Sequence, residues 1–177
     1  RAFYGFLTAR TVADFERAAS HIPASFNAFC ATRTGDIAYF YCGRAPIRAD
    51  GVDPRLPALG TGEYDWKGVM PFSEMPRVVN PKQGYIANWN NKPAVWWENA
   101  DTPVWGTIFR VYRLNELIRS KPRLTVDDVK AYIRDIAEYD EDAGRLLPMM
   151  LRIVKRNERN FSDELRAAVR LLEAWDC

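Results

Sequence analysis

The chain has 177 residues, 47% hydrophobic and 27% charged, with 25 Lys+Arg against 23 Asp+Glu and a net charge of +2. This composition is too apolar and too balanced in charge for a disordered polypeptide. The small net charge and scattered basic residues argue against a nucleic-acid partner, and the short apolar runs argue against a membrane span.

The first predicted elements are a short helix and a hairpin. Residues 11–20 carry apolar side chains at helical spacing, with Thr11 as N-cap and Asp14 three positions later. Two aromatic-rich runs joined by a three-residue turn predict an antiparallel hairpin: Phe26–Arg33, Thr34–Asp36 and Ile37–Cys42. We expect this hairpin to be buried on at least one face.

Two cysteines fall in the predicted arms of the hairpin, Cys30 and Cys42, so the two thiols could face each other. The chain has three Cys and one His, which leaves no Cys/His spacing for a zinc site. We therefore interpret the cysteines as small buried hydrophobic residues.

The next segment, residues 43–82, contains six of the 11 prolines and five of the ten glycines and shows no helical period. One interpretation is a solvated linker. The other is an ordered loop packed on the protein body, which the interleaved apolar side chains favour: Tyr64, Trp66, Val69, Met70, Phe72 and Val78. A short strand is predicted after it, over Gly84–Trp89.

The rest of the chain is predicted to be helical. A helix begins near residue 108, and Thr125 is the expected N-cap of the next, with acidic residues in its first turn. Three apolar stripes at helical spacing predict packing faces: Val129, Tyr132, Ile133 and Ile136; Leu146, Met149, Met150, Ile153 and Val154; and Leu165, Ala168, Val169 and Leu172. The fold class expected is therefore α+β, with a strand and loop part over 1–112 and a helical subdomain over 113–177.

Both ends of the sequence look abrupt. The chain opens at Arg1 with aromatic residues immediately after it, and the last helical pattern runs into Cys177 without a C-cap signal. We interpret the sequence as an internal segment of a longer polypeptide. The alternative is an N-terminally processed complete domain.

The sequence lacks the residue patterns of several common kinds of catalytic and phosphate-binding site. His21 is the only histidine available as a general base, and a His at that place after a short helix more often caps carbonyls or is solvated. The sequence has no Gly-x-Ser-x-Gly elbow and no glycine-rich phosphate loop. The acidic pairs lie at predicted helix starts, where capping is the ordinary interpretation.

The segment Asn88-Trp89-Asn90-Asn91-Lys92-Pro93 places three asparagines within four positions at the end of an apolar run. Buried amides need hydrogen-bond partners. One interpretation is a rigid Asn that donates an N–H to a developing oxyanion, and the other is an Asn-rich turn that satisfies its own backbone. Residue chemistry alone leaves both open.

The order of several motifs resembles the penicillin acylase family of N-terminal nucleophile amidohydrolases. The match covers essentially residues 24–176 and is carried by these segments: Gly35–Tyr39, Gly43-Arg44-x-Pro46, Asp53–Pro57, Gly60–Trp66, Pro71-Phe72, Asn80-Pro81, Gly84–Asn91 with Pro93, Asp101, Trp105-Gly106, Arg110 and, more weakly, Lys121–Thr125. The resemblance implies part of a four-layer αββα sandwich with a helical C-terminal subdomain.

The resemblance also implies site residues. The family nucleophile is a Ser, Cys or Thr freed as the first residue of a chain, whose α-amino group acts as base. In this sequence Asn90 matches the oxyanion-hole asparagine, and Arg110 matches an arginine near the site; the alternative for Arg110 is a surface ion pair. Phe26 matches a position lining the acyl pocket, for which ordinary strand core is the alternative.

A structural Ca²⁺ is implied as well, with the Pro54 carbonyl and the Asp101 carboxylate as two of its ligands. The other ligands would come from outside this sequence, as would the nucleophile, since the chain begins with Arg1. We therefore expect no amidase activity from this chain alone. By analogy with the family, a periplasmic or secreted location is expected.

Two functions follow. The favoured one is a portion of an amidohydrolase that cleaves small N-acyl substrates, such as β-lactam side chains or acyl-homoserine lactones, together with the remaining segments of the parent enzyme. The other is a nucleophile-lacking, aromatic-rich binding module of the same fold, in which six Trp, eight Tyr and nine Phe stack on flat ligands.

Overall fold

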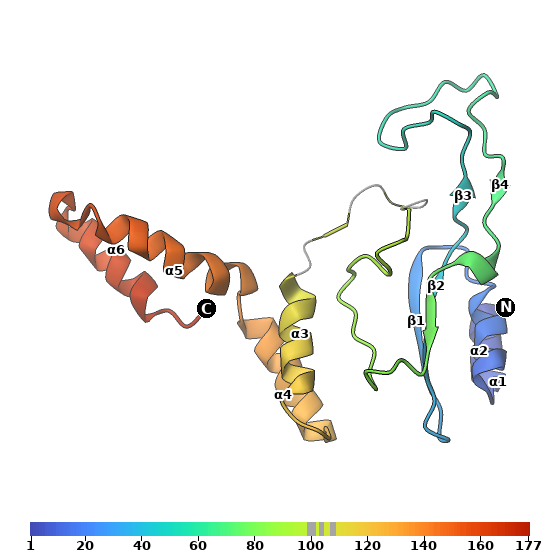
Figure 1. Cartoon of the computed structure of the whole chain (residues 1–177), viewed down its shortest axis with the longest axis horizontal. Coiled ribbons are helices and arrows are strands. Elements are labelled where there is room, and N and C mark those ends of the chain that lie inside the picture. Colours follow the sequence, from blue (N-terminus) through green and yellow to red (C-terminus); the bar gives the residue numbers. More distant parts are fainter. Residues whose placement is uncertain (99–101, 103–104, 107–108) are drawn as a thin grey trace. The chain divides into compact units, whose positions relative to one another are not determined.

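The computed structural model describes residues 1–98, 102, 105–106 and 109–177, the last range without the Phe109 side chain. Contacts divide the chain into two compact units, Arg1–Gly106 and Thr107–Cys177. The first combines helices with small antiparallel sheets and the second is helical (Figure 1), so the predicted α+β class is confirmed. None of the described helices is both long and apolar enough to cross a membrane.

A three-stranded antiparallel sheet in the order β1-β2-β5 is the centre of the first unit (Figure 1). Its strands are β1 (Phe26–Ala31), β2 (Ile37–Cys42) and β5 (Arg77–Val79). The hairpin register pairs Ala31 with Ile37 and Phe26 with Cys42, as a turn over residues 32–36 requires. β2 is buried along nearly its whole length and β1 only at Ala28, which confirms that the hairpin is buried on at least one face.

One face of the sheet is covered by α1 (Ala2–Thr8) and α2 (Val12–Ala19). Apolar residues of α2 and the sheet form a buried cluster there, made of Ala19, Ala28, Ala38, Phe40 and Cys42. The two helices approach closely because residue 5 is glycine: a Cβ there would lie 2.8 Å from Cβ of Ala18.

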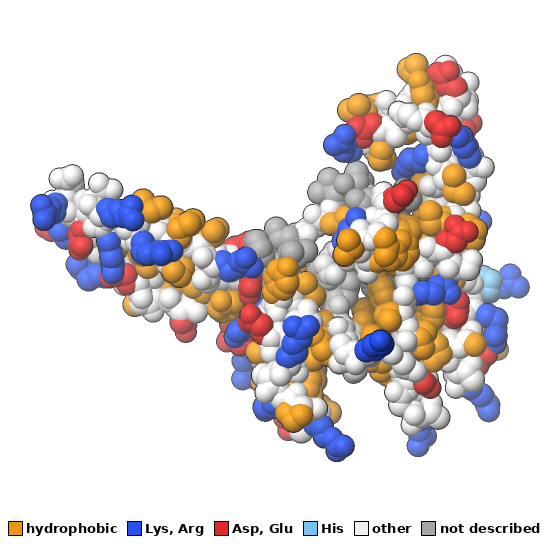
Figure 2. Space-filling view, in the orientation of Figure 1, with side chains coloured by type: hydrophobic (Ala, Val, Ile, Leu, Met, Phe, Trp, Pro, Cys, Tyr) orange, Lys and Arg blue, Asp and Glu red, His pale blue; other side chains and the backbone are white. Residues whose placement is uncertain are grey.

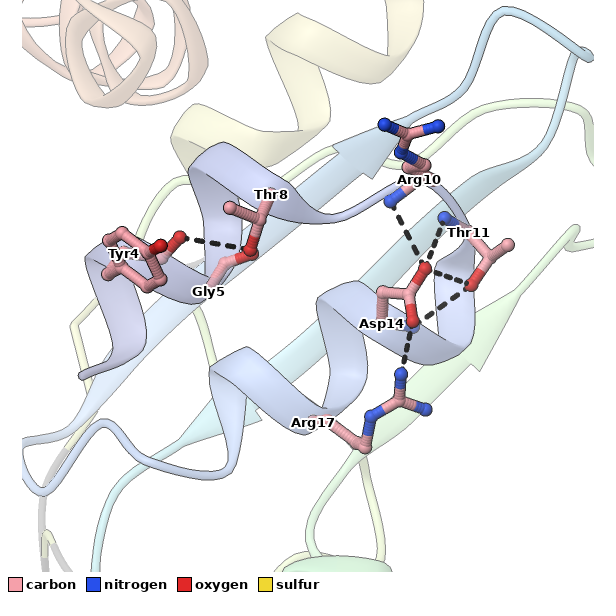
Figure 3. Close-up of polar contacts among 7 residues, drawn as sticks. All are labelled: Tyr4, Gly5, Thr8, Arg10, Thr11, Asp14 and Arg17. Atoms are coloured by element: carbon pink, nitrogen blue, oxygen red, sulfur yellow. Dashed lines mark hydrogen bonds and ion pairs between the residues drawn. The ribbon is translucent and has the colours of Figure 1, made fainter.

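The start of α2 has the predicted capping box. Thr11 Oγ1 accepts a hydrogen bond from the Asp14 N–H, and Asp14 Oδ2 accepts from the N–H and the hydroxyl of Thr11 (Figure 3). The same carboxylate also accepts from the Arg10 N–H and pairs with Arg17. The Thr11 hydroxyl, the two backbone N–H groups and Arg17 together lower the pKa of Asp14. The box satisfies N–H groups that a helix start leaves unpaired.

Aromatic side chains cover the other face of the sheet. Tyr39 and Tyr41 of β2 are buried together with Ala45, Met75 and Trp97, and the loop residues Ile86 and Trp105 pack against them. This second cluster positions the end of the hairpin next to the asparagine-rich segment.

The predicted strand over Gly84–Trp89 is wrong. The segment has no regular secondary structure, although Ile86 packs on the aromatic cluster. The edge of β2 is instead paired by β5, and the chain then turns through two positive φ angles, 47° at Asn80 and 78° at Gly84. After these turns Gly84, Tyr85 and Ile86 lie beside residues of β1 and β2 in one pocket, so they contact the sheet through side chains and form no backbone ladder with it.

The loop over residues 43–82 is ordered, but it does not pack along its whole length. β3 (Pro46–Ile47) pairs with β4 (Gly68–Val69), and η1 (Phe72–Glu74) precedes β5. Met70, Phe72 and Val78 pack on the body as predicted. Trp66, in the part between β3 and β4, is 56% exposed, because that part extends beyond the sheet (Figure 1).

The second unit contains four helices and the short η2 (Glu158–Asn160). They are α3 (Phe109–Arg119), α4 (Val126–Glu138), α5 (Glu141–Lys155) and α6 (Asp163–Ala174). Thr125, Asp140 and Ser162 each accept a backbone N–H as N-caps.

The predicted apolar stripes of this unit form its core only in part, at Val169. Leu147 and Val169 are the buried apolar residues of α5 and α6, whereas Met149 and Ile153 are about half exposed. Figure 2 shows hydrophobic side chains along the surface of α5. Four helices of this length offer more apolar surface than they can cover among themselves, which explains the difference.

Candidate active site

A pocket of about 290 Å³ in the first unit brings together two of the residues predicted for the site, Phe26 and Asn90. Its lining comes from the open end of the hairpin, the asparagine-rich segment and described residues that follow that segment: Ser25, Phe26, Asn27, Tyr41, Asn90, Thr102, Trp105 and Gly106. The pocket therefore joins segments that are up to 81 positions apart, counted from Ser25 to Gly106.

The hairpin supplies one wall of this pocket. Phe26, the first residue of β1, is 52% exposed and is thus not ordinary strand core. Asn27 and Tyr41 are directly opposite each other in the register, and the Tyr39 hydroxyl donates to Oδ1 of Asn27 over 2.6 Å. The Tyr41 ring lies 6.0 Å from that of Trp105, so these two rings and Phe26 give this part of the pocket an aromatic surface.

Two of the three asparagines in the opposite segment are used to hold the backbone. Oδ1 of Asn88 accepts the N–H of Asn90 over 3.0 Å, and Oδ1 of Asn91 accepts the N–H of Trp89 over 2.9 Å. The Asn91 amide also donates to the Lys92 carbonyl over 3.1 Å. The interpretation as a turn that satisfies its own backbone is therefore correct for Asn88 and Asn91.

Asn90 is different from its neighbours. It is exposed, its φ is 55°, and within the described part of the chain its side-chain amide has no hydrogen-bond partner. Asn is one of the few residues with a Cβ that adopts this left-handed conformation readily. The arrangement holds the backbone in place and leaves one amide of the segment available at the pocket.

The pocket contains no strong acid or base of its own. None of the lining residues that the structure describes is His, Asp, Glu, Lys or Arg. His21 is exposed just after the end of α2, where its backbone N–H donates a hydrogen bond to the Ala18 carbonyl. Burial raises the pKa of the Cys42 thiol to about 11, which makes it a poor nucleophile. The site offers hydrogen-bond donors and aromatic surface, and it lacks a base for nucleophilic attack.

Neither Arg110 nor Pro54 is among the lining residues of this pocket. Arg110 is an exposed residue of α3 in the second unit, and its role stays a prediction. Pro54 is exposed in the loop between β3 and β4, while Asp101 lies outside the described residues. The neighbouring Asp53 is bound by Arg55 through 2.7 and 2.9 Å contacts, and Arg55 holds the pKa of Asp53 at about 2.

The described residues therefore do not build a calcium site by themselves. They contain no group of three His, Cys, Asp or Glu side chains placed to hold a metal ion. Pro54 contributes a single accessible carbonyl, whereas Ca²⁺ takes six to eight oxygen ligands. The roles of Pro54 and Asp101 as calcium ligands therefore stay predictions.

Sequence reasoning missed Asn27 and Tyr41 as pocket residues. The predicted hairpin could have indicated them. In a hairpin whose turn is centred on Thr34, residues equally distant from Thr34 face each other, and this places Asn27 opposite Tyr41. Trp105 carried no comparable signal, because its place depends on how an irregular loop folds back.

Comparison with known proteins identifies relatives of the whole chain. The model of the penicillin amidase family matches residues 1–177. Penicillin G acylase of Escherichia coli is 36% identical over 172 residues, which cover 96% of this chain and 20% of that protein. Penicillin acylase 2 proenzyme of a Pseudomonas species is 31% identical over 112 residues, covering 57% of this chain and 13% of that protein.

A solved structure shows the same fold. The thermostable penicillin G acylase from Alcaligenes faecalis, in an orthorhombic form, superposes with a TM-score of 0.78 at 30% sequence identity. The match covers 98% of this chain and 31% of that chain. The chain thus spans a fifth or less of the length of these curated relatives and under a third of the solved one.

Proposed function

Because the chain belongs to the penicillin amidase family, we propose that it is part of an amidohydrolase that cleaves the amide bond of N-acylated compounds. Suitable substrates are small, such as β-lactams with an acyl side chain or acyl-homoserine lactones. The match to acylases along the whole chain supports the reaction type, and the aromatic wall of the pocket supports an apolar acyl group.

The observation that carries this proposal is the free amide of Asn90 beside Phe26 in one pocket. Attack on an amide carbonyl creates a tetrahedral intermediate with a negatively charged oxygen. A donor held in position before the reaction stabilises this oxyanion and loses little energy in reorganisation. In our proposal Nδ2 of Asn90 is that donor, and Phe26 contacts the acyl group.

The proposed reaction needs a nucleophile from another segment. The pocket lining has no ionisable base among the described residues, and the relatives are much longer than this chain. We assign the nucleophile and base to a chain-terminal Ser, Cys or Thr and its α-amino group, whose ordinary pKa near 8 suits a base at neutral pH. The remaining segments of the parent enzyme are then the partners of this chain, and the chain alone is inactive.

Calcium binding is a separate part of the proposal. We propose that the Pro54 carbonyl and the Asp101 carboxylate provide two oxygen ligands, completed by residues outside this chain. Isothermal titration of Ca²⁺ into the complete hydrolase and into the 177-residue chain tests this. We expect the complete hydrolase to bind Ca²⁺ and its Asp101→Ala variant to lose this binding. The 177-residue chain alone is expected to bind Ca²⁺ weakly or not at all.

Kinetics of the complete hydrolase polypeptide that carries this segment test the role of Asn90. We expect Asn90→Ala to lower kcat about 10²- to 10³-fold while KM changes little, because the lost bond forms in the transition state. Asn80→Ala is the matched control, since Asn80 is also an asparagine with a positive φ in this unit and does not line the pocket. Normal turnover by Asn90→Ala would contradict the proposal.

A further inference from the structure

We propose that Asn88 and Asn91 are positioning residues for Asn90, a role that rests on the proposed function. Neither residue lines the pocket, so neither is placed to touch a substrate there. Both bind backbone N–H groups immediately around Asn90 through their side-chain oxygens. They act on the reaction only through the orientation that they give to the Asn90 amide.

The two side chains hold successive peptide groups. The bond from the Asn90 N–H to Asn88 Oδ1, 3.0 Å, closes a turn of the Asx type across Trp89. The bond from the Trp89 N–H to Asn91 Oδ1, 2.9 Å, runs in the opposite chain direction and spans Asn90. The N–H groups on both sides of Trp89 are therefore fixed by side chains that flank Asn90 in the sequence.

This double restraint matters because Asn90 has a φ of 55°. A residue with a Cβ has lower energy in the ordinary helical or extended regions, so the backbone of Asn90 relaxes toward them when the restraint is removed. Such a change rotates the Cα–Cβ bond and moves the amide away from the pocket. A displacement of about 1 Å at a catalytic group is enough to cost on the order of 100-fold in rate.

The chain after the turn adds to the restraint. Asn91 Nδ2 donates to the Lys92 carbonyl over 3.1 Å, and Pro93 limits the backbone of Lys92 to extended conformations. Asn91 thus uses both ends of its amide on the backbone of this segment. Asn88 and Asn91 therefore hold the backbone of the segment, and the Asn90 amide is the one that is available at the pocket.

A purely structural role for Asn88 and Asn91 makes a different prediction. In that case their removal lowers stability and the amount of folded enzyme, and kcat per folded molecule stays constant. Asn80 is the matched comparison, because its amide also binds backbone and side-chain groups, the Ile37 N–H and Asp36 Oδ1, at 2.9 Å each. Asn80→Ala removes comparable bonds in the same unit without touching the turn at Asn90.

The experiment measures kcat and KM of the complete hydrolase for Asn88→Ala, Asn91→Ala, Asn88→Ser, Asn80→Ala and Asn90→Ala, with active-site titration to count folded enzyme. We expect both Asn88→Ala and Asn91→Ala to lower kcat about 10- to 100-fold with KM within about twofold. Asn88→Ser regains at least part of this loss, since a hydroxyl closes the same kind of turn more weakly.

Four results would overturn the proposal. The first is a normal kcat for both Asn88→Ala and Asn91→Ala while Asn90→Ala is impaired, which leaves the proposed function intact. The second is an equal loss of kcat in Asn80→Ala, and the third is no recovery in Asn88→Ser. The fourth is a normal kcat in Asn90→Ala, which also overturns the proposed function. If Asn88→Ala does not fold, Asn91→Ala alone decides.

Discussion

The hydroxyl of Tyr39 on β2 donates a 2.6 Å hydrogen bond to Oδ1 of Asn27 on β1, joining diagonal positions of the hairpin beside the pocket. Tyr39→Phe removes this donor, so the partly buried Oδ1 of Asn27 loses that hydrogen bond. We expect the free energy of unfolding to fall by about 1 kcal/mol. Urea denaturation of the chain measures this, with Tyr64→Phe in the loop as control; an unchanged midpoint would refute it.

The cysteines make a second prediction. The register pairs Cys30 with Ala38 and Cys42 with Phe26, so the two thiols do not face each other and all three cysteines are free. Burial raises the pKa of Cys42 to about 11, and at pH 8 almost no thiolate is present there. We expect iodoacetamide to leave Cys42 unmodified in the native chain and to label all three cysteines in urea.

Peptide mapping by mass spectrometry identifies the labelled residues. Native labelling of Cys42 at the rate of Cys177, or a disulfide between Cys30 and Cys42, would show that the hairpin register is different from the one described here.

Acid stability of the helical unit depends on Asp128 in the cap of α4. Lys121 pairs with this carboxylate, the N–H and hydroxyl of Thr125 each donate to it over 2.8 Å, and they hold its pKa at about 2. The unfolded value is about 3.9, so folding is stabilised above pH 3.9 and this contribution is lost as the pH falls toward 2. Circular dichroism during acid titration follows the loss of helix.

Asp128→Asn removes the charge and tests this assignment. We expect lower helix stability at pH 7 and a shallower loss of helix between pH 4 and 2 than in the parent chain. Asp127→Asn is the control, since Asp127 lies in the same turn but is 90% exposed and pairs with Lys130. An acid transition of unchanged slope in Asp128→Asn would contradict the prediction.

We expect Gly144→Ala in α5 to destabilise the chain, although Gly→Ala changes within helices usually stabilise. An exposed Gly→Ala change within a helix usually stabilises by about 1 kcal/mol. Here the new Cβ would overlap the hydroxyl end of Tyr139, whose ring lies 4.5 Å from the Arg113 guanidinium. Moving the ring weakens this cation–π contact, so we expect Gly144→Ala to destabilise the unit by about 1 kcal/mol.

A double-mutant cycle isolates the cause. In a Tyr139→Leu background the clash is absent, and Gly144→Ala is expected to stabilise the chain as it does in an ordinary helix. Thermal denaturation measures both effects. Stabilisation by Gly144→Ala in the parent chain would mean that the ring moves without loss.

Local sequence signals predicted much of the fold. The capping pairs Thr11–Asp14 and Thr125–Asp128 marked the starts of α2 and α4, and two aromatic-rich runs joined by a short turn marked the hairpin. These features depend on contacts within a few residues or across one turn, which sequence patterns report directly. The same patterns failed at Gly84–Trp89, because a strand also needs backbone hydrogen bonds to a neighbouring strand, and this segment contacts the sheet through side chains such as Ile86.

The site was predictable to a smaller extent. Three asparagines in one segment indicated a turn or a catalytic amide; the turn interpretation is correct for Asn88 and Asn91, and the catalytic one stays a prediction for Asn90. Residue types alone could not show that Asn88 and Asn91 bind the backbone while Asn90 does not. That division depends on the local backbone conformation, including the φ of 55° at Asn90, which residue types do not report.

The most direct test of the account compares catalysis with transition-state binding. In the complete hydrolase, Asn90→Gly keeps the positive φ available and removes only the amide. We predict that kcat/KM falls about 10²- to 10³-fold and that the inhibition constant of a phosphonate analogue of the tetrahedral intermediate rises by the same factor. A fall in kcat/KM with an unchanged inhibition constant, or no change in either, would contradict the oxyanion role of Asn90.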